Sequence, residues 1–125
     1  MAHRLSPDGR MWALWRVDPQ ARKAVLGIAA ADGSDFRELY SPGFSTVFTH
    51  LAWTRDGRTI LFKLQDKPQI MRIPAQGGAP EPTGIEVTES MMNMDVSPDG
   101  SRLAYSATKA PEQLWSLDNV LTGLK

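Results

Sequence analysis

The sequence predicts an all-β protein built from three copies of one small antiparallel sheet. Three observations predict it: a turn motif that occurs three times, short apolar strands after each turn, and the lack of helical periodicity. Nine Pro and ten Gly punctuate the 125 residues. No window holds an apolar stripe of 3.6-residue period over three turns. A short terminal helix over residues 113–124 is kept only as an alternative.

The repeated motif reads Ser-Pro-Asp-Gly at residues 6–9 and 97–100 and Thr-Arg-Asp-Gly at residues 54–57. These residue types are typical of a tight hairpin turn. Pro pre-sets the φ angle of the second position, Asp bonds the backbone two residues on, and Gly takes positive φ without steric cost. The middle copy has Arg55 in place of Pro. We therefore predict a structural role in turns, with the backbone or side-chain geometry carried by Asp8, Gly9, Asp56, Gly57, Asp99 and Gly100.

The residues after each turn alternate as a buried strand does. Apolar residues stand three and five positions after the Gly, and the position between them is also apolar, which predicts a strand covered on both faces. These triplets are 12–14, 60–62 and 103–105. A second strand with two apolar residues, a variable one and a third apolar one follows at 25–28, 70–73 and 114–117.

The remaining strands complete each repeat. Asp32-Gly33 and Gly77-Gly78 are two-residue hairpin signals, and they predict short outer strands at 35–40 and 81–84. Inner strands are expected before the second and third turns, at 47–53 and 91–96. The first copy has only residues 2–5 in that place, so its inner strand is expected to be missing. The third copy has no such hairpin signal after its second strand, so no outer strand is expected there.

The spacing of the turns defines the domain organisation. The turn aspartates are 48 and 43 residues apart, and periods of about 40–50 residues belong to propeller blades or to arrays of paired helices. The strand pattern favours blades of four antiparallel strands. We expect one partial propeller domain over residues 1–125, with repeats at 1–46, 47–90 and 91–125 and about two and a half to three blades.

The repeat resembles the WD40-like, SPDG-containing propeller repeat of the TolB family. Residues 52–62 (AWTRDGRTILF) and 95–105 (DVSPDGSRLAY) match its first half, and residues 70–80 (IMRIPAQGGAP) match its second half. The resemblance covers nearly the whole chain. The ending, QLWSLDN at 113–119, is similar to the close of such a propeller and implies the C-terminal blades of a longer protein.

The resemblance implies a non-enzymatic scaffold that binds a protein or peptide, since TolB-like propellers are linked to bacterial envelope complexes. It is compatible with a periplasmic location, although residues 1–10 do not form a signal peptide. Similar propellers are also attached to kinases and to DNA-binding regulators. The alternative is the accessory propeller of a larger enzyme, such as a prolyl-oligopeptidase-like hydrolase or a propeller lyase.

The number of blades predicts an assembly. Closed propellers have about 4–8 blades, so three blades leave two sheet faces uncovered, and contiguous apolar patches of that size are rare on monomers. We expect those faces to carry Trp12, Trp15, Leu103 and Tyr105. Two copies would form a six-bladed ring with strands exchanged at the seams. The competing interpretation is that upstream blades are missing.

The composition excludes several functions. The chain has no Cys, which excludes disulfides, thiolate zinc sites and Cys nucleophiles. Lys plus Arg and Asp plus Glu both number 14, and this zero net charge argues against nucleic acid as a partner. No apolar run approaches the about 18 residues of a membrane span.

No catalytic, cofactor or metal residue is predicted. His3 and His50 are the only histidines and lack metal-ligand spacing. A Ser-His-Asp triad could be assembled from Ser45, His50 and Asp56, but we do not predict one because the sequence has no nucleophile elbow, Gly-x-Ser-x-Gly. The run at 91–94 (MMNM) fits an adaptable interaction surface or an inner strand equally well. Core packing is expected for Trp12, Trp15, Trp53 and Trp115 rather than sugar stacking.

Overall fold

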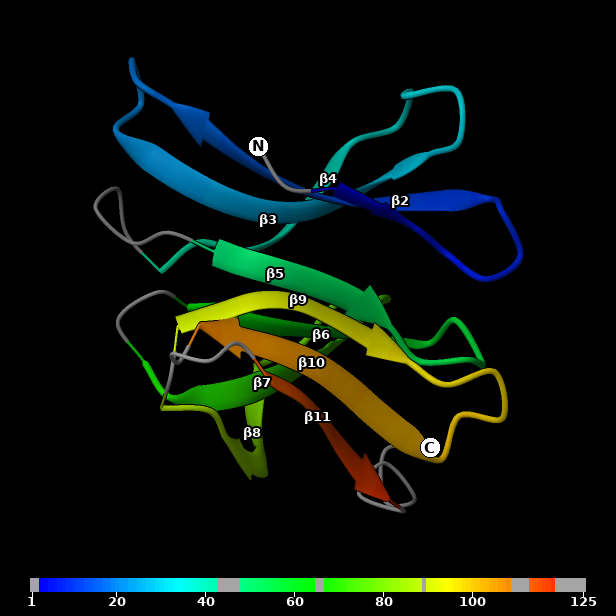
Figure 1. The fold of residues 1–125 in the computed structure, drawn as a ribbon. Helices are drawn as coiled ribbons and strands as arrows, with labels where there is room; N and C mark the ends of the chain where they lie inside the picture. Colours follow the sequence, from blue (N-terminus) through cyan, green and yellow to red (C-terminus); the bar gives the residue numbers. More distant parts are fainter. Residues whose placement is uncertain (1–2, 43–47, 65–66, 89, 109–112, 119–125) are drawn as a thin grey trace.

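The computed structural model describes residues 3–42, 48–64, 67–88, 90–108 and 113–118. These residues form strands and turns, with eleven strands in three antiparallel sheets (Figure 1). The described part of the chain contains no helix, and therefore no helix that is long and apolar enough to cross a membrane. The predicted all-β fold class is confirmed.

The first sheet has four strands in sequence order. They are β1 (His3–Leu5), β2 (Met11–Asp18), β3 (Lys23–Ala30) and β4 (Arg37–Tyr40). β2 and β3 pair over their full lengths, and the pairing of β3 with β4 shifts register after Leu26. The predicted outer strand at 35–40 therefore exists and is two residues shorter. β1 pairs with β2, so the expectation of a missing inner strand in the first copy was wrong.

The second sheet repeats this order. Its strands are β5 (Phe48–Trp53), β6 (Thr59–Leu64), β7 (Gln69–Pro74) and β8 (Glu81–Glu86). The outer strand β8 extends two residues beyond the predicted 81–84. Each strand pairs with the next through an antiparallel ladder, so the sheet is a simple meander.

The third sheet has three strands among the described residues: β9 (Ser90–Val96), β10 (Arg102–Thr108) and β11 (Gln113–Asp118). β11 pairs with β10 from Gln113 to Asp118. The alternative of a helix over residues 113–118 is therefore wrong, because this segment completes the ladder of β10. Its continuation at 119–125 lies outside the described residues.

The three sheets are stacked face to face through their first strands. β1 contacts β5, and β5 contacts β9, so the inner strands lie next to one another (Figure 1). Arg4 of β1 reaches across to the third sheet, where it donates hydrogen bonds to the Met94 carbonyl at 3.1 Å and the Asp95 carboxylate at 2.9 Å. Three repeats are thus joined at one side of the stack.

The core consists of two layers, one on each face of the second sheet. Ile60 and Phe62 of β6 are fully buried against the first sheet, in a cluster that includes Ala13, Leu26 and Ile28. Leu61, which points the other way, is fully buried in the cluster facing the third sheet. This confirms that the post-turn strand of the second repeat is covered on both faces.

Three of the four residues expected on uncovered faces are covered instead. Leu103 and Tyr105 belong to the cluster between the second and third sheets and are 0 % and 7 % exposed. Trp15 packs against the cluster between the first and second sheets. The prediction was wrong for Trp15 because its parity is opposite to that of Trp12. It was wrong for Leu103 and Tyr105 because, in the third sheet, their repeat position faces the second sheet. Only Trp12, which has the opposite parity to Ala13 and Trp15, lies on an outward face.

Candidate functional site

The first Asp–Gly turn is held by a compact set of hydrogen bonds. The Ser6 hydroxyl donates to Asp8 Oδ1 at 2.6 Å, and the Arg10 amide donates to the same oxygen at 3.0 Å. The Met11 amide donates to Ser6 Oγ at 3.1 Å. Gly9 has a φ of 75°, a left-handed conformation that glycine adopts without strain. The side chain of Asp8 is thus engaged within its own turn.

The other two turns repeat these bonds, and the two bonds to the Asp carboxylate have the same lengths. Thr54 and Ser97 donate to Asp56 and Asp99 at 2.6 Å each. The amides of the residues two positions after each Asp donate at 3.0 Å. Figure 1 shows the three turns along one edge of the stack, at the right of the view. We call this edge the Asp–Gly rim.

Hydrogen bonding favours the charged form of these carboxylates. The Ser6 hydroxyl and the Arg10 amide lower the pKa of Asp8 below its ordinary value. The Ser97 hydroxyl and the Ser101 amide lower the pKa of Asp99 strongly. Burial alone would raise the pKa of Asp56, but the Thr54 hydroxyl and the Arg58 amide outweigh it and lower the pKa. All three groups therefore favour ionisation.

Arg55 connects two neighbouring turns. Its Nε donates to the Pro98 carbonyl at 3.2 Å. A Cβ built on Gly100 would lie 3.2 Å from Arg55 Cγ. The residue that replaces Pro in the middle copy thus packs the second turn against the third, a contact that its place in a local turn motif did not indicate.

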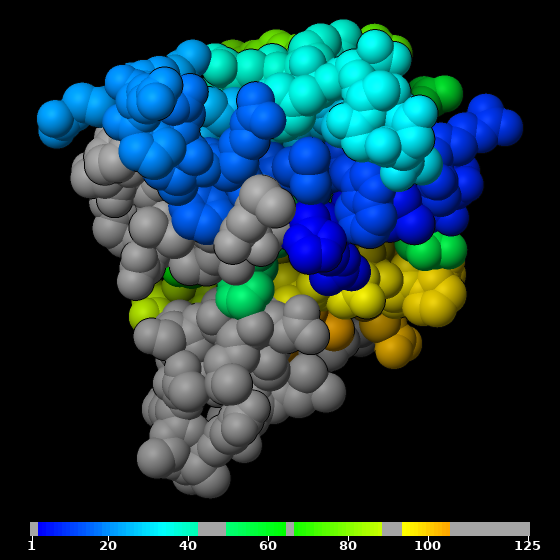
Figure 2. All heavy atoms as spheres, turned by 90° about the horizontal axis from the view of Figure 1, so that it is seen from above, coloured from blue at the N-terminus to red at the C-terminus, as the bar shows by residue number. Residues whose placement is uncertain are grey.

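Within the described part of the chain, no other sheet covers one apolar face of the first sheet. Trp12 and Leu14 point to it, and their cross-strand partners Leu5 and His3 share that face. His3 and Trp12 meet edge to face at 5.5 Å. Leu5 is 43 % exposed, and Trp12 and Leu14 are half-buried. We call this the outward face of the first sheet, and Figure 2 shows the side of the molecule formed by its blue to cyan strands.

The far part of this outward face is filled by Phe36. A Cβ built on Gly27 would lie 2.5 Å from the Phe36 ring and 2.6 Å from the Arg37 carbonyl oxygen. Arg16 stacks over the same ring, with its guanidinium carbon 3.7 Å from the ring centroid. Gly27 stands at the variable position of the predicted strand, and glycine is required there because Phe36 occupies the space of a side chain.

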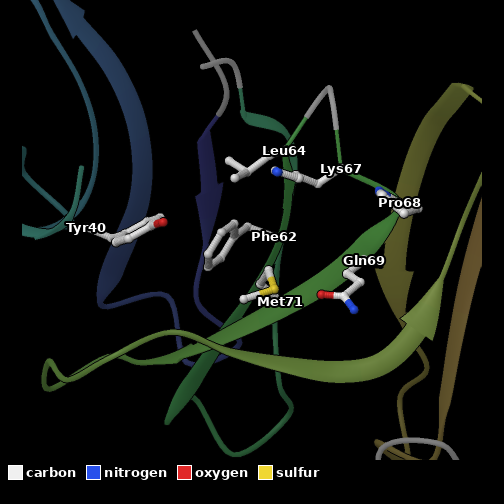
Figure 3. Close-up of a pocket in the computed structure, with 7 residues that line it drawn as sticks. All are labelled: Tyr40, Phe62, Leu64, Lys67, Pro68, Gln69 and Met71. Atoms are coloured by element: carbon white, nitrogen blue, oxygen red, sulfur yellow. The ribbon is translucent and has the colours of Figure 1, made fainter. Parts of the chain in front are cut away.

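A pocket of about 360 Å³ opens between the first and second sheets, where β6 leads into β7, at the end of β6 away from its Asp–Gly turn. Figure 3 shows Tyr40 of the first sheet across from Phe62 and Met71 of the second, with its hydroxyl turned toward them. The rings of Tyr40 and Phe62 are 5.8 Å apart. The pocket is lined by Tyr40, Phe62, Leu64, Lys67, Pro68, Gln69 and Met71.

The candidate catalytic and metal-binding residues do not come together in the described part of the chain. His3 stacks on Trp12, His50 lies within β5, and Asp56 is held in its turn by Thr54. Ser45 lies outside the described residues. Among the residues that the structure describes, no three His, Asp or Glu side chains gather in a way that could hold a metal ion.

The described tryptophan and methionine side chains of interest pack in the core or donate hydrogen bonds to backbone carbonyls. Trp53 is 5 % exposed and donates to the Arg4 carbonyl at 3.0 Å. Trp12 donates to the Ala31 carbonyl at 3.1 Å. Met94 is 1 % exposed in the core between the second and third sheets. The side chains of Trp115 and of residues 91–93 lie outside the described ones.

Comparison with known proteins identifies the architecture. No protein-family model matches the sequence, and no curated protein matches it. Among solved structures, TolB from Acinetobacter baumannii is similar with a TM-score of 0.72 at 12 % identity, over 94 % of this chain and 29 % of that one. The Cps50 (Swd1) β-propeller domain from Myceliophteria thermophila gives 0.60 at 20 % identity, over 94 % and 33 %. Hydrazine synthase from Kuenenia stuttgartiensis gives 0.64 at 15 % identity, over 94 % and 32 %.

These stacked meanders, joined through their inner strands, define a set of β-propeller blades. The chain spans about a third of the length of each of these three structures, so it is a partial propeller. Its fold is similar to that of TolB and of other WD40-like propellers, as the repeat motif predicted.

Proposed function

We propose that the chain is a non-enzymatic propeller scaffold that mediates protein–protein interaction. It forms one partial propeller domain over residues 1–125, with repeats at 1–46, 47–90 and 91–125. In this proposal Asp8, Asp56 and Asp99 and the glycines after them shape the turns and are not a binding or catalytic site. The hydrogen bonds within each turn support this role, since the carboxylates are already engaged.

The observation that carries the proposal is the outward face of the first sheet. Its Trp12 and Leu14 occupy the same repeat positions as Ile60 and Phe62 in the second sheet and Leu103 and Tyr105 in the third. Those equivalents are 0–7 % exposed because another sheet covers them, whereas Trp12 and Leu14 are only half-buried. An aromatic and aliphatic sheet face of this kind is suited to a protein surface.

The proposed cover is a sheet of a second copy of this chain. Two copies supply six sheets, which lies within the range of about 4–8 blades in closed propellers. Closure would place a third sheet of the partner on the outward face of the first sheet. The other occupant, a blade from further chain upstream, is the alternative that the experiment must separate.

Light scattering with two matched variants tests this assembly. Leu5 on the outward face and Val17 at the end of β2 are 43 % and 42 % exposed, but Val17 shares the inward parity of Ala13 and Trp15. We expect the mass of two chains for the wild type and for Val17→Arg, and of one chain for Leu5→Arg. A stable, compact monomer of the wild type would overturn the second-copy assembly.

A second candidate function is the accessory propeller of a larger enzyme. It is favoured by the similarity to hydrazine synthase, which is named as an enzyme. In that case the chemistry would reside outside these blades. Purification of the tagged protein from its own cells discriminates the two: a catalytic polypeptide in stoichiometric amount supports the enzyme, and its absence with retained self-association supports the scaffold.

A further inference from the structure

His3 stands at a repeat position that is apolar and fully buried in the other two sheets. Counted back from the three turns, it corresponds to Leu51 of β5 and Met94 of β9, which are 2 % and 1 % exposed. Each of these two side chains lies in the core between its own sheet and the preceding one. His3 is exposed on the outward face of the first sheet. The first repeat therefore carries a titratable ring where the others carry a core residue.

The third sheet has the complementary face. Ala104 of β10 points away from the second sheet, since its neighbours Leu103 and Tyr105 point toward it. Ala13 and Leu61 hold the same repeat position, and both are 0 % exposed because the next sheet covers them, whereas Ala104 is half-buried. Among the described residues, the contact between consecutive sheets is thus made twice, and one half of a third contact stands at each end. The third sheet of a second copy supplies the half that the outward face lacks.

The chain's own groups around His3 offer it no free carboxylate. His3 meets the Trp12 ring edge to face at 5.5 Å. Arg16, the next charged residue of β2 on that face, is positive and stacks on an aromatic ring. Asp18 at the end of β2 accepts two amides of its own turn. β5, which also contacts β1, has His50 as its only ionisable side chain.

Across the closed seam, the carboxylate nearest to His3 is already engaged. The covering sheet would bring Asp95 of the second copy toward His3, since their equivalents Ala52 and Met94 pack in one core. Within its own chain Asp95 accepts a hydrogen bond from the Arg4 guanidinium at 2.9 Å, and this ion pair balances its charge. The seam therefore supplies no unbalanced negative charge at this carboxylate.

Closing the seam thus favours the neutral form of His3. Arg102 and Asp118 of the second copy are cross-strand partners with opposite charges and lie nearer the rim. Removing an imidazolium from water costs more than removing a neutral imidazole, so burial between two sheets lowers the pKa of the ring. Unperturbed histidine titrates between about pH 5 and 8. Association is therefore strongest above the pKa of free His3 and weakens as the pH falls through it.

We propose that His3 makes the self-association of the chain sensitive to pH. Neutral His3 lets the third sheet of a second copy cover the outward face of the first sheet, and protonation of His3 opens this seam. The inference rests on the proposed function as a self-associating scaffold and adds its regulation.

Sedimentation velocity of the full chain at several pH values from about 8 to 5.5, the range of histidine titration, tests the switch. We expect the dissociation constant of the wild-type dimer to rise at least about tenfold over this range. His3→Leu, which gives the first sheet an apolar residue like that of the other two, should stay dimeric throughout. His50→Gln changes the only other histidine and should keep the pH dependence of the wild type.

A permanently charged side chain provides the opposite variant. His3→Lys should be monomeric even at about pH 8, because lysine keeps its charge there. A His3→Lys dimer as tight as the wild type would overturn the inference, and so would equal pH dependence of the wild type and His3→Leu. Tighter association of the wild type at lower pH would also overturn it, since the imidazolium would then pair with Asp95.

The outcomes separate this inference from the proposed function. If the wild type is dimeric at every pH with an unchanged dissociation constant, the switch is wrong and the second-copy assembly stands. If the wild type is monomeric at every pH, the second-copy assembly itself fails.

Discussion

At the scale of single residues, the three Asp–Gly turns are stabilised by the same set of hydrogen bonds. Each turn needs a residue with positive φ, an acceptor for the amides that follow, and a hydroxyl that holds the acceptor. Gly57, Asp56 and Thr54 supply these in the middle repeat, where Thr replaces the Ser of the other two. The substitution is tolerated because only the hydroxyl takes part in the bonds.

The lowered pKa values predict how acid affects stability. A carboxylate whose pKa is lower in the folded state than in the unfolded state stabilises the fold above its unfolded pKa, about 3.9 for Asp. That contribution is lost as the pH falls through the folded-state pKa. We expect wild-type stability to drop below about pH 4, and a triple Asn variant of Asp8, Asp56 and Asp99 to lose less over the same range.

Urea unfolding at a series of pH values from about 2 to 6 measures this difference. Glu86→Gln serves as the control, since it removes an exposed carboxylate at the end of β8, outside the three turns, and we expect this variant to follow the wild type. Parallel curves for the wild type and the triple variant would contradict a stabilising role of the ionised turn aspartates.

At the scale of elements, contacts between turns are set by the neighbouring repeat. Gly9 and Gly100 have nearly the same φ, 75° and 77°, but their surroundings differ. A Cβ on Gly9 would meet no atom within 4 Å, whereas on Gly100 it would approach Arg55. The two glycines therefore separate the cost of backbone strain from the cost of crowding between turns.

We expect Gly9→Ala to cost about 1–2 kcal/mol in the free energy of unfolding, because left-handed backbone is strained for any residue with a Cβ. Gly100→Ala should cost more, and Arg55→Ala should remove the excess in a double-mutant cycle. Equal costs at the two glycines, measured by urea unfolding, would show that Arg55 moves aside without loss and that the contact between the turns is weak.

At the scale of the whole molecule, the blades are held together by the apolar cores between neighbouring sheets. Among the residues that the structure describes, the second sheet has a core on each face, whereas the first sheet has a core on one face only. Binding of any further sheet to the outward face stabilises the folded state by mass action. If that sheet belongs to a second copy, as we propose, the chain gains stability as its own concentration rises.

We expect the thermal midpoint of the wild type to rise by several degrees between about 5 and 200 µM protein, because a dimer that dissociates on unfolding is favoured at high concentration. Differential scanning calorimetry measures it. Leu5→Arg should show no such rise, and Val17→Arg should behave as the wild type. A midpoint of the wild type that does not depend on concentration would argue for a blade set that is stable alone.

Much of this architecture could be predicted from local patterns. The turns, the alternation of residues 60–62 and the Gly77-Gly78 signal each depend on backbone preferences within a few residues, and they predicted the second sheet strand by strand. The outward face was predicted less well. Strand alternation alone does not say which parity faces a neighbour, so Leu103 and Tyr105 were placed on the wrong side.

The sequence by itself determined the all-β class, the three turns and the order of strands within each blade, because these follow from short-range sterics and hydrogen bonding. Only the tertiary structure decided which faces are covered, how Arg4 and Arg55 join separate repeats, and that Tyr40 and Lys67 border one pocket. Those features depend on how twisted sheets stack. They join residues that are far apart in the chain, and local sequence patterns do not predict such contacts.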